Sequence, residues 1–197
     1  NGHIVTVAAS VSADQIVIEN GGRINVNSGR TLTIANGTGT DMVNNGIIGN
    51  TGTITVSGGA TINHAAGGTY MHLQNGGTIP NATWNATSNC NITNITTTLP
   101  SQISQNYGNL TWNCTGQTGV LTLNTNMSIQ SDFTINSTGS SRLELNDGFT
   151  SRTFTIGGNY IQTGGNLRLT DGWTSGTMNI TGSCSISGGE LMGNNSN

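Results

Sequence analysis

The chain has 197 residues and a formal net charge of −3; hydrophobic residues make up 32% of it and charged residues only 7%. Its five basic residues are all arginines, scattered and without interleaved aromatic residues, which argues against nucleic-acid binding, and no apolar run is long enough for a transmembrane helix. Disorder is the competing interpretation of so polar a chain, but the low net charge and the many β-branched residues at alternating positions favour a folded β protein.

Short segments in which apolar and polar residues alternate follow one another along the whole chain. Alternation with a period of two is typical of strands that bury one face, and glycine pairs between the segments allow sharp turns. No stretch carries the spacing of an amphipathic helix, so the chain is predicted to be all-β. We predict strands at Ile4–Val7, Gln15–Ile18, Arg23–Val26, Thr31–Ile34, Thr53–Val56, Leu110–Trp112, Leu121–Leu123, Met127–Ile129, Asp132–Ile135, Leu143–Leu145, Leu167–Leu169 and Met178–Ile180.

A repeat decides between a sandwich and a solenoid. The segment at 153–169 recurs 24 residues later at 177–193, with Ile156 answering to Ile180 and Leu167 to Leu191. A fixed interval of this size indicates stacked units that bury their apolar faces against each other. We therefore predict one domain over 1–197, a parallel β-helix (β-solenoid) of roughly eight or nine coils. Parallel crossovers are right-handed in nearly all sheets, so a right-handed helix is expected.

One region interrupts the rhythm. Both prolines of the chain, Pro80 and Pro100, bound the segment "PNATWNATSNCNITNITTTLP", and proline cannot donate to a strand ladder. We expect an irregular coil or a protruding loop around 80–108, with Trp84 covering the core. The segment also holds four N-x-S/T triplets, which are candidate glycosylation sites if the protein meets the enzymes that read them, at Asn81, Asn85, Asn91 and Asn94.

The cysteines lie at Cys90, Cys114 and Cys184, an odd number without the C-x-x-C spacing of a zinc site. Because Cys90 and Cys114 are 24 residues apart, the interval of the repeat, they are predicted to form a pair on adjacent coils. A ladder of two buried thiols is favoured over a disulfide, since directly stacked neighbours would strain the bond.

The titratable residues show no catalytic, cofactor-binding or metal-binding pattern. No two acidic residues are adjacent, and His3, His64 and His72 lack metal-ligand spacing and are expected to be exposed. Asp147 and Asp171 lie one repeat apart and stacking would bring them together, yet each precedes a glycine, as turn residues do. We therefore expect no enzyme and no cofactor.

Threonine offers a less favoured function. T-x-T units at Thr31–Thr33, Thr53–Thr55 and Thr153–Thr155 would bind ice if they formed a flat array on most coils, but the corresponding units at 121–123 and 178–180 lack them. Threonine on the outer face of a strand also follows from β-propensity alone.

Several phrases, among them "GHIVTVAASVSADQIVIENGGRINVNSGRTLTIANGTGT" and "YGNLTWNCTGQTGVLTLNTNMSIQSDFTI", resemble the glycine- and threonine-rich β-helical repeats of large secreted or cell-surface proteins of Bacteroidota-type bacteria. The resemblance covers nearly the whole chain. It implies an extracellular, adhesin-like or filamentous structural role, and it supplies no catalytic residues. The main alternative is a carbohydrate-active or carbohydrate-binding β-helix, with surface glycans as partners.

The two ends of the sequence bear on assembly. The chain enters the strand "HIVTV" at once, and "CSISGGELMG" is still on the repeat near its other end. Open strand edges at the end coils favour either head-to-tail stacking of subunits into a filament or continuation into further repeats of a longer protein.

Overall fold

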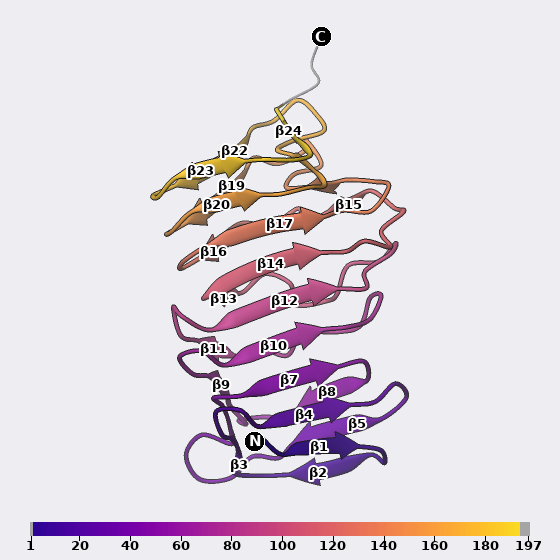
Figure 1. The fold of residues 1–197 in the computed structure, drawn as a ribbon, viewed down its shortest axis with the longest axis vertical. Coiled ribbons are helices and arrows are strands. Elements are labelled where there is room, and N and C mark those ends of the chain that lie inside the picture. Colours follow the sequence, from indigo (N-terminus) through magenta and orange to yellow (C-terminus); the bar gives the residue numbers. More distant parts are fainter. Residues whose placement is uncertain (1, 194–197) are drawn as a thin grey trace.

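The computed structural model describes residues 2–193, which form a parallel β-solenoid of stacked coils (Figure 1). The 24 strands are paired in parallel throughout, and residues 2–193 contain no helix. The predicted all-β parallel solenoid is therefore confirmed. One nine-stranded sheet runs the length of the molecule and takes one strand from each coil: β1 (Ile4–Val7), β4 (Arg23–Val26), β7 (Ile47–Asn50), β10 (Thr69–His72), β12 (Asn89–Thr93), β14 (Asn109–Asn113), β17 (Phe133–Ser137), β20 (Tyr160–Gln162) and β23 (Cys184–Ile186).

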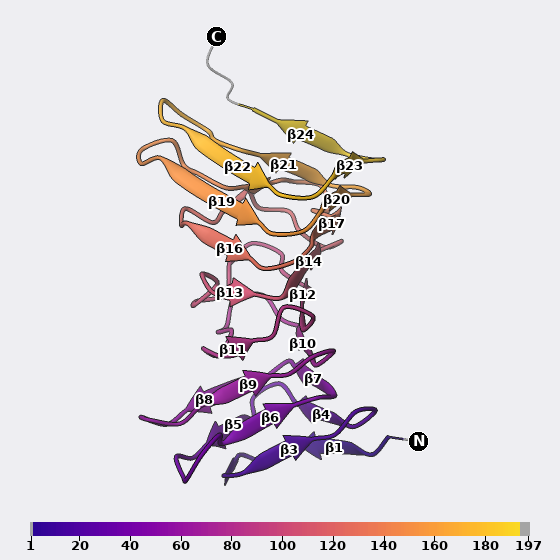
Figure 2. The same cartoon turned by 90° about the vertical axis from the view of Figure 1, so that its left-hand side faces the viewer.

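Four shorter sheets complete the walls of the solenoid (Figure 2). The strands that follow the main sheet in each coil form two of them: β2 (Val11–Ala13), β5 (Thr31–Ile34) and β8 (Thr53–Val56), then β15 (Leu121–Thr122), β18 (Leu143–Glu144), β21 (Asn166–Arg168) and β24 (Glu190–Met192). The last strands of each coil form the other two: β3 (Ile16–Ile18), β6 (Met42–Asn44), β9 (Ile62–His64) and β11 (Thr83–Trp84), then β13 (Asn106–Tyr107), β16 (Met127–Ile129), β19 (Arg152–Ile156) and β22 (Gly176–Ile180).

The 24-residue repeat gives the true register of the last coils. Ile156 pairs with Ile180, and Leu167 pairs with Leu191, as the sequence predicts. Other coils differ in length: residues stacked between β12 and β14 are 20 apart, and those between the starts of β17 and β20 are 27 apart. The strands stay in register because the corners between them differ in the number of residues they contain.

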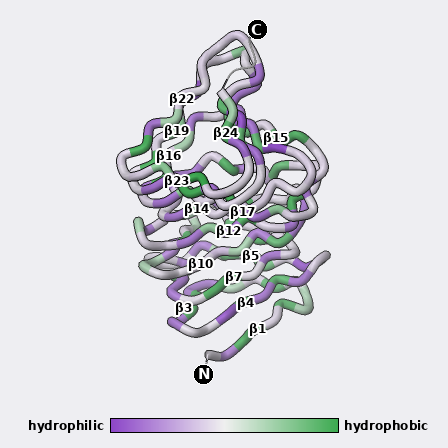
Figure 3. The backbone as a smooth tube through the Cα atoms, turned by 45° about the horizontal axis from the view of Figure 1, so that its top comes forward, coloured by the Kyte–Doolittle hydropathy of each residue, from purple (hydrophilic) through white to green (hydrophobic). Residues whose placement is uncertain are grey.

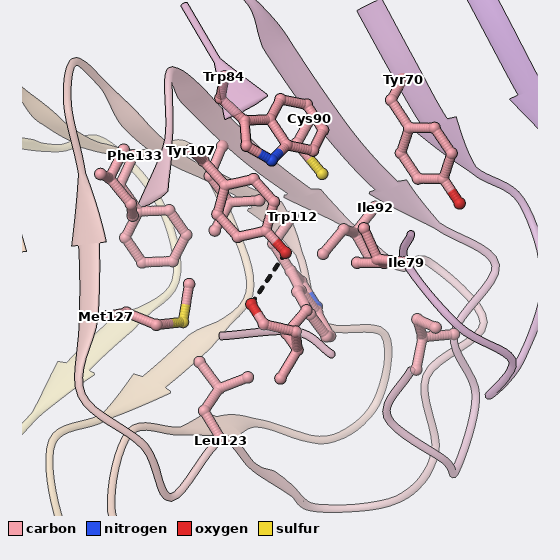
Figure 4. Close-up of a cluster of buried hydrophobic side chains, with 14 of the residues drawn as sticks. Tyr70, Ile79, Trp84, Cys90, Ile92, Tyr107, Trp112, Leu123, Met127 and Phe133 are labelled. Atoms are coloured by element: carbon pink, nitrogen blue, oxygen red, sulfur yellow. Dashed lines mark hydrogen bonds between the residues drawn. The ribbon is translucent and has the colours of Figure 1, made fainter. Parts of the chain in front are cut away.

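Alternation places one side chain in two inside the solenoid. In β14, Leu110 and Trp112 are buried whereas Thr111 faces outward. Trp112 lies among Tyr107, Phe133 and the other inward side chains of the central coils (Figure 4). Along the tube, hydrophobic and hydrophilic segments alternate at the scale of a few residues (Figure 3). The core is therefore a narrow column, which a chain with 32% hydrophobic residues can fill.

Glycine is required at the corner that precedes the main sheet. A Cβ at Gly46 would overlap the carbonyl oxygen of Gly22 on the previous coil and lie 2.6 Å from that of Glu19. At the same corner a Cβ on Gly108 would lie 2.5 Å from the carbonyl oxygen of Ser88. Close stacking of backbone on backbone thus explains why glycine recurs at the rhythm of the coils.

The irregular region overlaps the predicted range only in part. The range 80–108 contains β11, β12 and β13, and β12 is one of the longest strands of the main sheet. The interruption is in the second wall, where segments 73–82 and 94–105 hold only an isolated bridge between Thr78 and Ser101. Trp84 is buried, as predicted. The prolines mark the irregular wall correctly, but asparagines facing outward from β12 conceal a regular strand.

Candidate functional site

Two exposed aromatic side chains mark the strongest candidate site. The chain has three Trp, three Tyr and three Phe residues, and seven of these nine are buried. The other two are Phe149, which is 85% exposed, and Trp173, which is 99% exposed. They occupy the same place in the sequences "DGFTS" (147–151) and "DGWTS" (171–175), which we call the aromatic loops.

The aromatic loops lie on successive coils and are stacked in register. Glu144 pairs with Arg168 before the loops, and Arg152 pairs with Gly176 after them, so the two loops have equal length. The Asp171 amide donates to the carbonyl oxygen of Asn146 at 3.1 Å. Phe149 and Trp173 therefore hold equivalent positions on neighbouring turns of the solenoid.

A partly buried ion cluster lies at the base of the loops. Arg142 Nε donates to Glu144 Oε1 at 2.6 Å, and Arg168 Nη1 lies 3.6 Å from the same oxygen and also pairs with Asp171. The Thr122 hydroxyl donates to Glu144 Oε2 at 2.9 Å. Both arginines are therefore already occupied by carboxylates, and the cluster holds the two coils in register beneath the loops.

The predicted pair of Asp147 and Asp171 does not form one carboxylate site. The loops do stack, but Asp171 pairs with Arg168, whereas Asp147 Oδ2 accepts from Asn124 Nδ2 at 2.6 Å. Asp147 Oδ1 accepts from the amide of Phe149 at 3.1 Å, which is the bond of an Asx turn. The turn interpretation of these residues is thus the one that their contacts support.

A small hollow of about 230 Å³ lies beside the second loop. Trp173, Thr174 and Ser175 line it from the loop itself, and Leu169 and Thr170 line it from the preceding segment. One aromatic face, an aliphatic side chain and several hydroxyl and backbone polar groups therefore meet at one open place on the surface.

The histidine prediction is wrong for two of the three residues. His3 is exposed, but His64 and His72 point into the core and are 1% and 0% exposed. Asn44 Nδ2 lies 3.0 Å from His64 Nδ1 and also donates to the Thr69 carbonyl oxygen, so Nδ1 is the acceptor. The Trp84 ring stacks on His64 with 4.0 Å between centroids. Burial lowers the pKa of His64 to about 3.

His72 belongs to a second polar group in the core. Its Nε2 lies 2.7 Å from the Gly76 carbonyl oxygen and donates to it, and Nδ1 lies 3.4 Å from the Tyr70 hydroxyl. Asn50 Nδ2 donates to that hydroxyl at 3.0 Å. Burial lowers the pKa of His72 as well. Both histidines are neutral, hydrogen-bonded core residues rather than surface residues.

The predicted cysteine pair is confirmed in part: both thiols are buried and free on neighbouring coils, but they do not stack directly on each other. Cys90 and Cys114 lie on neighbouring coils and both are buried, but the residue stacked on Cys90 is Leu110. Cys114 instead follows Asn113, the partner of Thr93, so the two thiols are four positions out of register and remain free. The coils here repeat after 20 residues, not 24, which is why the interval misleads.

The four candidate glycosylation sites do not share one protruding loop. Asn81 and Asn85 flank β11 and are exposed, although Asn85 Oδ1 accepts hydrogen bonds from Thr87 of its own triplet. Asn91 lies half-buried on the outer face of β12. Asn94 is exposed at the next corner, where its Nδ2 donates to the carbonyl oxygen of Leu73 at 3.3 Å. Asn81, Asn85 and Asn94 are therefore the exposed residues of the four, and the Asn81 side chain is free of the hydrogen bonds that hold the side chains of Asn85 and Asn94.

Sequence reasoning did not find a polar ladder along one edge of the main sheet. Each side chain in it bonds to the next coil: Asn109 Nδ2 donates to Asn89 Oδ1 at 3.3 Å, and Asn159 Nδ2 donates to Asp132 Oδ1 at 3.1 Å. Six successive coils contribute one member each, namely Thr69, Asn89, Asn109, Asp132, Asn159 and Ser183. The ladder ties the coils together from outside, in addition to the backbone bonds.

The T-x-T units are split between different walls. Thr31 and Thr33 of β5 stack on Thr53 and Thr55 of β8, so this array covers two coils. The unit in β19 belongs to the other wall, where Thr155 pairs with Asn179 of β22.

No group of three or more His, Cys, Asp and Glu side chains within residues 2–193 is arranged to hold a metal ion. The same range contains no helix of the length and apolarity that crossing a membrane requires. Comparisons with protein-family models, with curated proteins and with solved structures find no match for this chain.

Proposed function

We propose that this chain is an extracellular structural and adhesive β-solenoid, either a filament-forming subunit or a segment of a larger surface protein. The observation that carries the proposal is the polar ladder on the nine-stranded sheet, which joins six coils on the outside of the molecule by four side-chain to side-chain hydrogen bonds and one from the Asp132 backbone amide to Asn109 Oδ1. A column bonded through backbone, core and surface resists bending, and its outer faces offer amides and hydroxyls to other molecules. The resemblance to Bacteroidota-type surface repeats supports the same role.

Assembly along the axis is part of the proposal. Strands β1, β2 and β3 at one end, and β22, β23 and β24 at the other, pair on one side only within residues 2–193. Val5 of the first coil is 57% exposed, although Ile48, which stacks in the same column through Ile24, is 1% exposed. A further coil would cover such side chains, and it comes either from another copy or from the same polypeptide.

Sedimentation velocity and electron microscopy of the 197-residue chain test the assembly. Self-stacking predicts concentration-dependent rods longer than one molecule. A monodisperse monomer at high concentration would contradict self-stacking and leave continuation into further repeats.

An assay for polysaccharide cleavage distinguishes the structural role from a carbohydrate-active enzyme. Soluble neutral and uronic-acid polysaccharides are incubated with the chain, with and without calcium, and the reducing ends are measured. The proposal predicts no turnover. Turnover that is lost in Asp147→Asn or Asp171→Asn would contradict the structural role and support the carbohydrate-active alternative.

Glycosylation at Asn81 is proposed because its triplet is exposed beside β11. Mass spectrometry of the proteolytic peptide that contains Asn81, taken from protein of the natural source, tests it: an attached glycan raises the mass of that peptide, and an unshifted mass contradicts the proposal.

A further inference from the structure

We propose that the aromatic loops bind a neutral polysaccharide, with Phe149 and Trp173 stacking on the C–H faces of its sugar rings. The inference rests on the proposed adhesive function and names the chemical class of the target. Phe149 and Trp173 are 85% and 99% exposed, so packing within the fold does not account for these two large apolar side chains.

Exposure of these rings is unfavourable unless something covers them. Phenylalanine and tryptophan carry large apolar areas, and all seven other aromatic residues of the chain are buried. Neither ring belongs to the core, and the loops are anchored by Asp147, Asn146 and Asp171 without help from either ring. The two exposed aromatic residues hold equivalent positions in two stacked loops, which favours a shared function over chance.

The surroundings of the rings suit a sugar. A pyranose ring has an apolar face of C–H groups, which stacks on an aromatic face, and a rim of hydroxyls, which need hydrogen-bond partners. The loops offer both: each ring is followed by Thr and Ser, and the hollow beside Trp173 combines Leu169 with the polar groups of Thr170, Thr174 and Ser175. Successive coils rise by about 4.8 Å, close to the length of one sugar residue in an extended chain. The spacing of sugar residues along a polysaccharide therefore resembles the spacing of the aromatic loops along the solenoid.

Charge favours a neutral polymer over an acidic one or an anionic membrane. Each loop carries a carboxylate, at Asp147 and Asp171, and the chain has no lysine. The nearby Arg168 is paired with Glu144 and Asp171, and Arg152 Nε donates to Asn124 at 3.1 Å. Around the loops the carboxylates of Glu144, Asp147 and Asp171 balance the guanidinium groups of Arg142, Arg152 and Arg168, so positive charge is not in excess there for uronates, sulfates or lipid phosphates, which recruit Lys and Arg. The loops also lack aliphatic side chains that would insert into a bilayer.

Binding is measured by affinity electrophoresis and by tryptophan fluorescence, using soluble glucan, xylan and mannan as neutral probes and polygalacturonate as the acidic one. Trp173 is the only exposed tryptophan among residues 2–193, because Trp84 and Trp112 are buried, so a shift of the solvent-exposed emission reports on this site. We expect at least one neutral polymer to bind, Trp173→Ala to weaken that binding about tenfold, and Phe149→Ala to weaken it severalfold.

Val17→Ala is the matched control, because Val17 is 56% exposed on the first coil, far along the solenoid from the loops. All three variants remove exposed side chains, so their melting temperatures should equal that of the parent and their folds are directly comparable.

The inference is overturned if no neutral polymer binds, if the double variant of Phe149 and Trp173 binds as the parent does, or if polygalacturonate binds more tightly than every neutral polymer. Sedimentation with phosphatidylcholine vesicles that is lost in Trp173→Ala would overturn it in favour of a lipid. The location of the protein on the cell surface is measured separately. If the protein lies on the surface but binds no neutral polymer, this inference is wrong and the proposed function stands.

Discussion

Acid should destabilise the protein through a histidine in its core. His64 is 1% exposed, its Nδ1 accepts from Asn44, and burial lowers its pKa to about 3. In the unfolded chain the same ring takes up a proton near pH 6.5, its ordinary pKa. Between these values the unfolded state binds more protons, so the free energy of unfolding is at its full value above pH 6.5 and falls as the pH is lowered toward 3.

The size of the effect follows from one proton. The slope below pH 6 is about 1.4 kcal/mol per pH unit, which amounts to roughly 2.5 kcal/mol between pH 7.5 and 4.5 for His64 alone. The pKa of His72 is lowered in the same direction and adds to the loss. Asp41, whose pKa is lowered by hydrogen bonds from the amides of Gly37 and Thr61, contributes stability that is lost only below about pH 4. The two windows are thus separate.

The assay is urea unfolding at four pH values from 7.5 to 4.5, followed by tryptophan fluorescence and by circular dichroism, because Trp84 stacks on His64. Coincident transitions establish two-state behaviour. His64→Gln should lower the pH slope by about one proton, and His3→Gln, which changes an exposed residue, should leave it unchanged. A slope that is the same in the parent and in His64→Gln would refute the reasoning.

Two further predictions concern packing and thiols. Gly46→Ala should lower the free energy of unfolding by more than about 2 kcal/mol, because its Cβ would overlap a backbone carbonyl oxygen of the previous coil. Gly58→Ala is the control, since open space surrounds Gly58, and it should have little effect. Equal melting temperatures for the two variants would contradict the stacking geometry. In the folded protein a thiol reagent at pH 8 should label one cysteine, Cys184, since Cys90 and Cys114 are buried with raised pKa values, and it should label all three after unfolding. A disulfide between the buried pair, seen as two fewer thiols after unfolding without reductant, would contradict the observed register.

The fold was predictable because its signal is periodic. Alternation in Thr31–Ile34 and Thr53–Val56 gives both strands with their observed bounds, and the repeat gives the pairing of Ile156 with Ile180. Strands such as Met42–Asn44 and Ile62–His64 were missed, because polar residues occupy inward positions in them.

Asn44 and His64 satisfy each other only across neighbouring coils, a contact 20 residues apart that no local pattern contains. The same holds for the polar ladder, since its bonds join residues 20 to 27 apart on coils of unequal length. The error over Cys90 and Cys114 has the same origin, because one repeat length was extended to coils that do not share it.

The candidate site was within reach of the sequence. The segments "DGFTS" and "DGWTS" lie 24 residues apart, and their aspartate-glycine pairs predict turns, but a lone aromatic residue in a turn carries no local signal of its function. The sequence does not show that these two rings are exposed to solvent. A tryptophan is ordinarily a largely buried residue, and only the structure of the stacked loops shows Phe149 and Trp173 facing solvent.

Immunogold electron microscopy of intact cells from the natural source tests the central claim, that the protein is an extracellular structural and adhesive solenoid, most directly. Antibodies raised against residues 1–197 are applied before and after permeabilisation. The account predicts gold particles on the outer surface or on filaments of unpermeabilised cells, with no increase after permeabilisation. Labelling that appears only after permeabilisation would place the protein inside the cell and contradict the account.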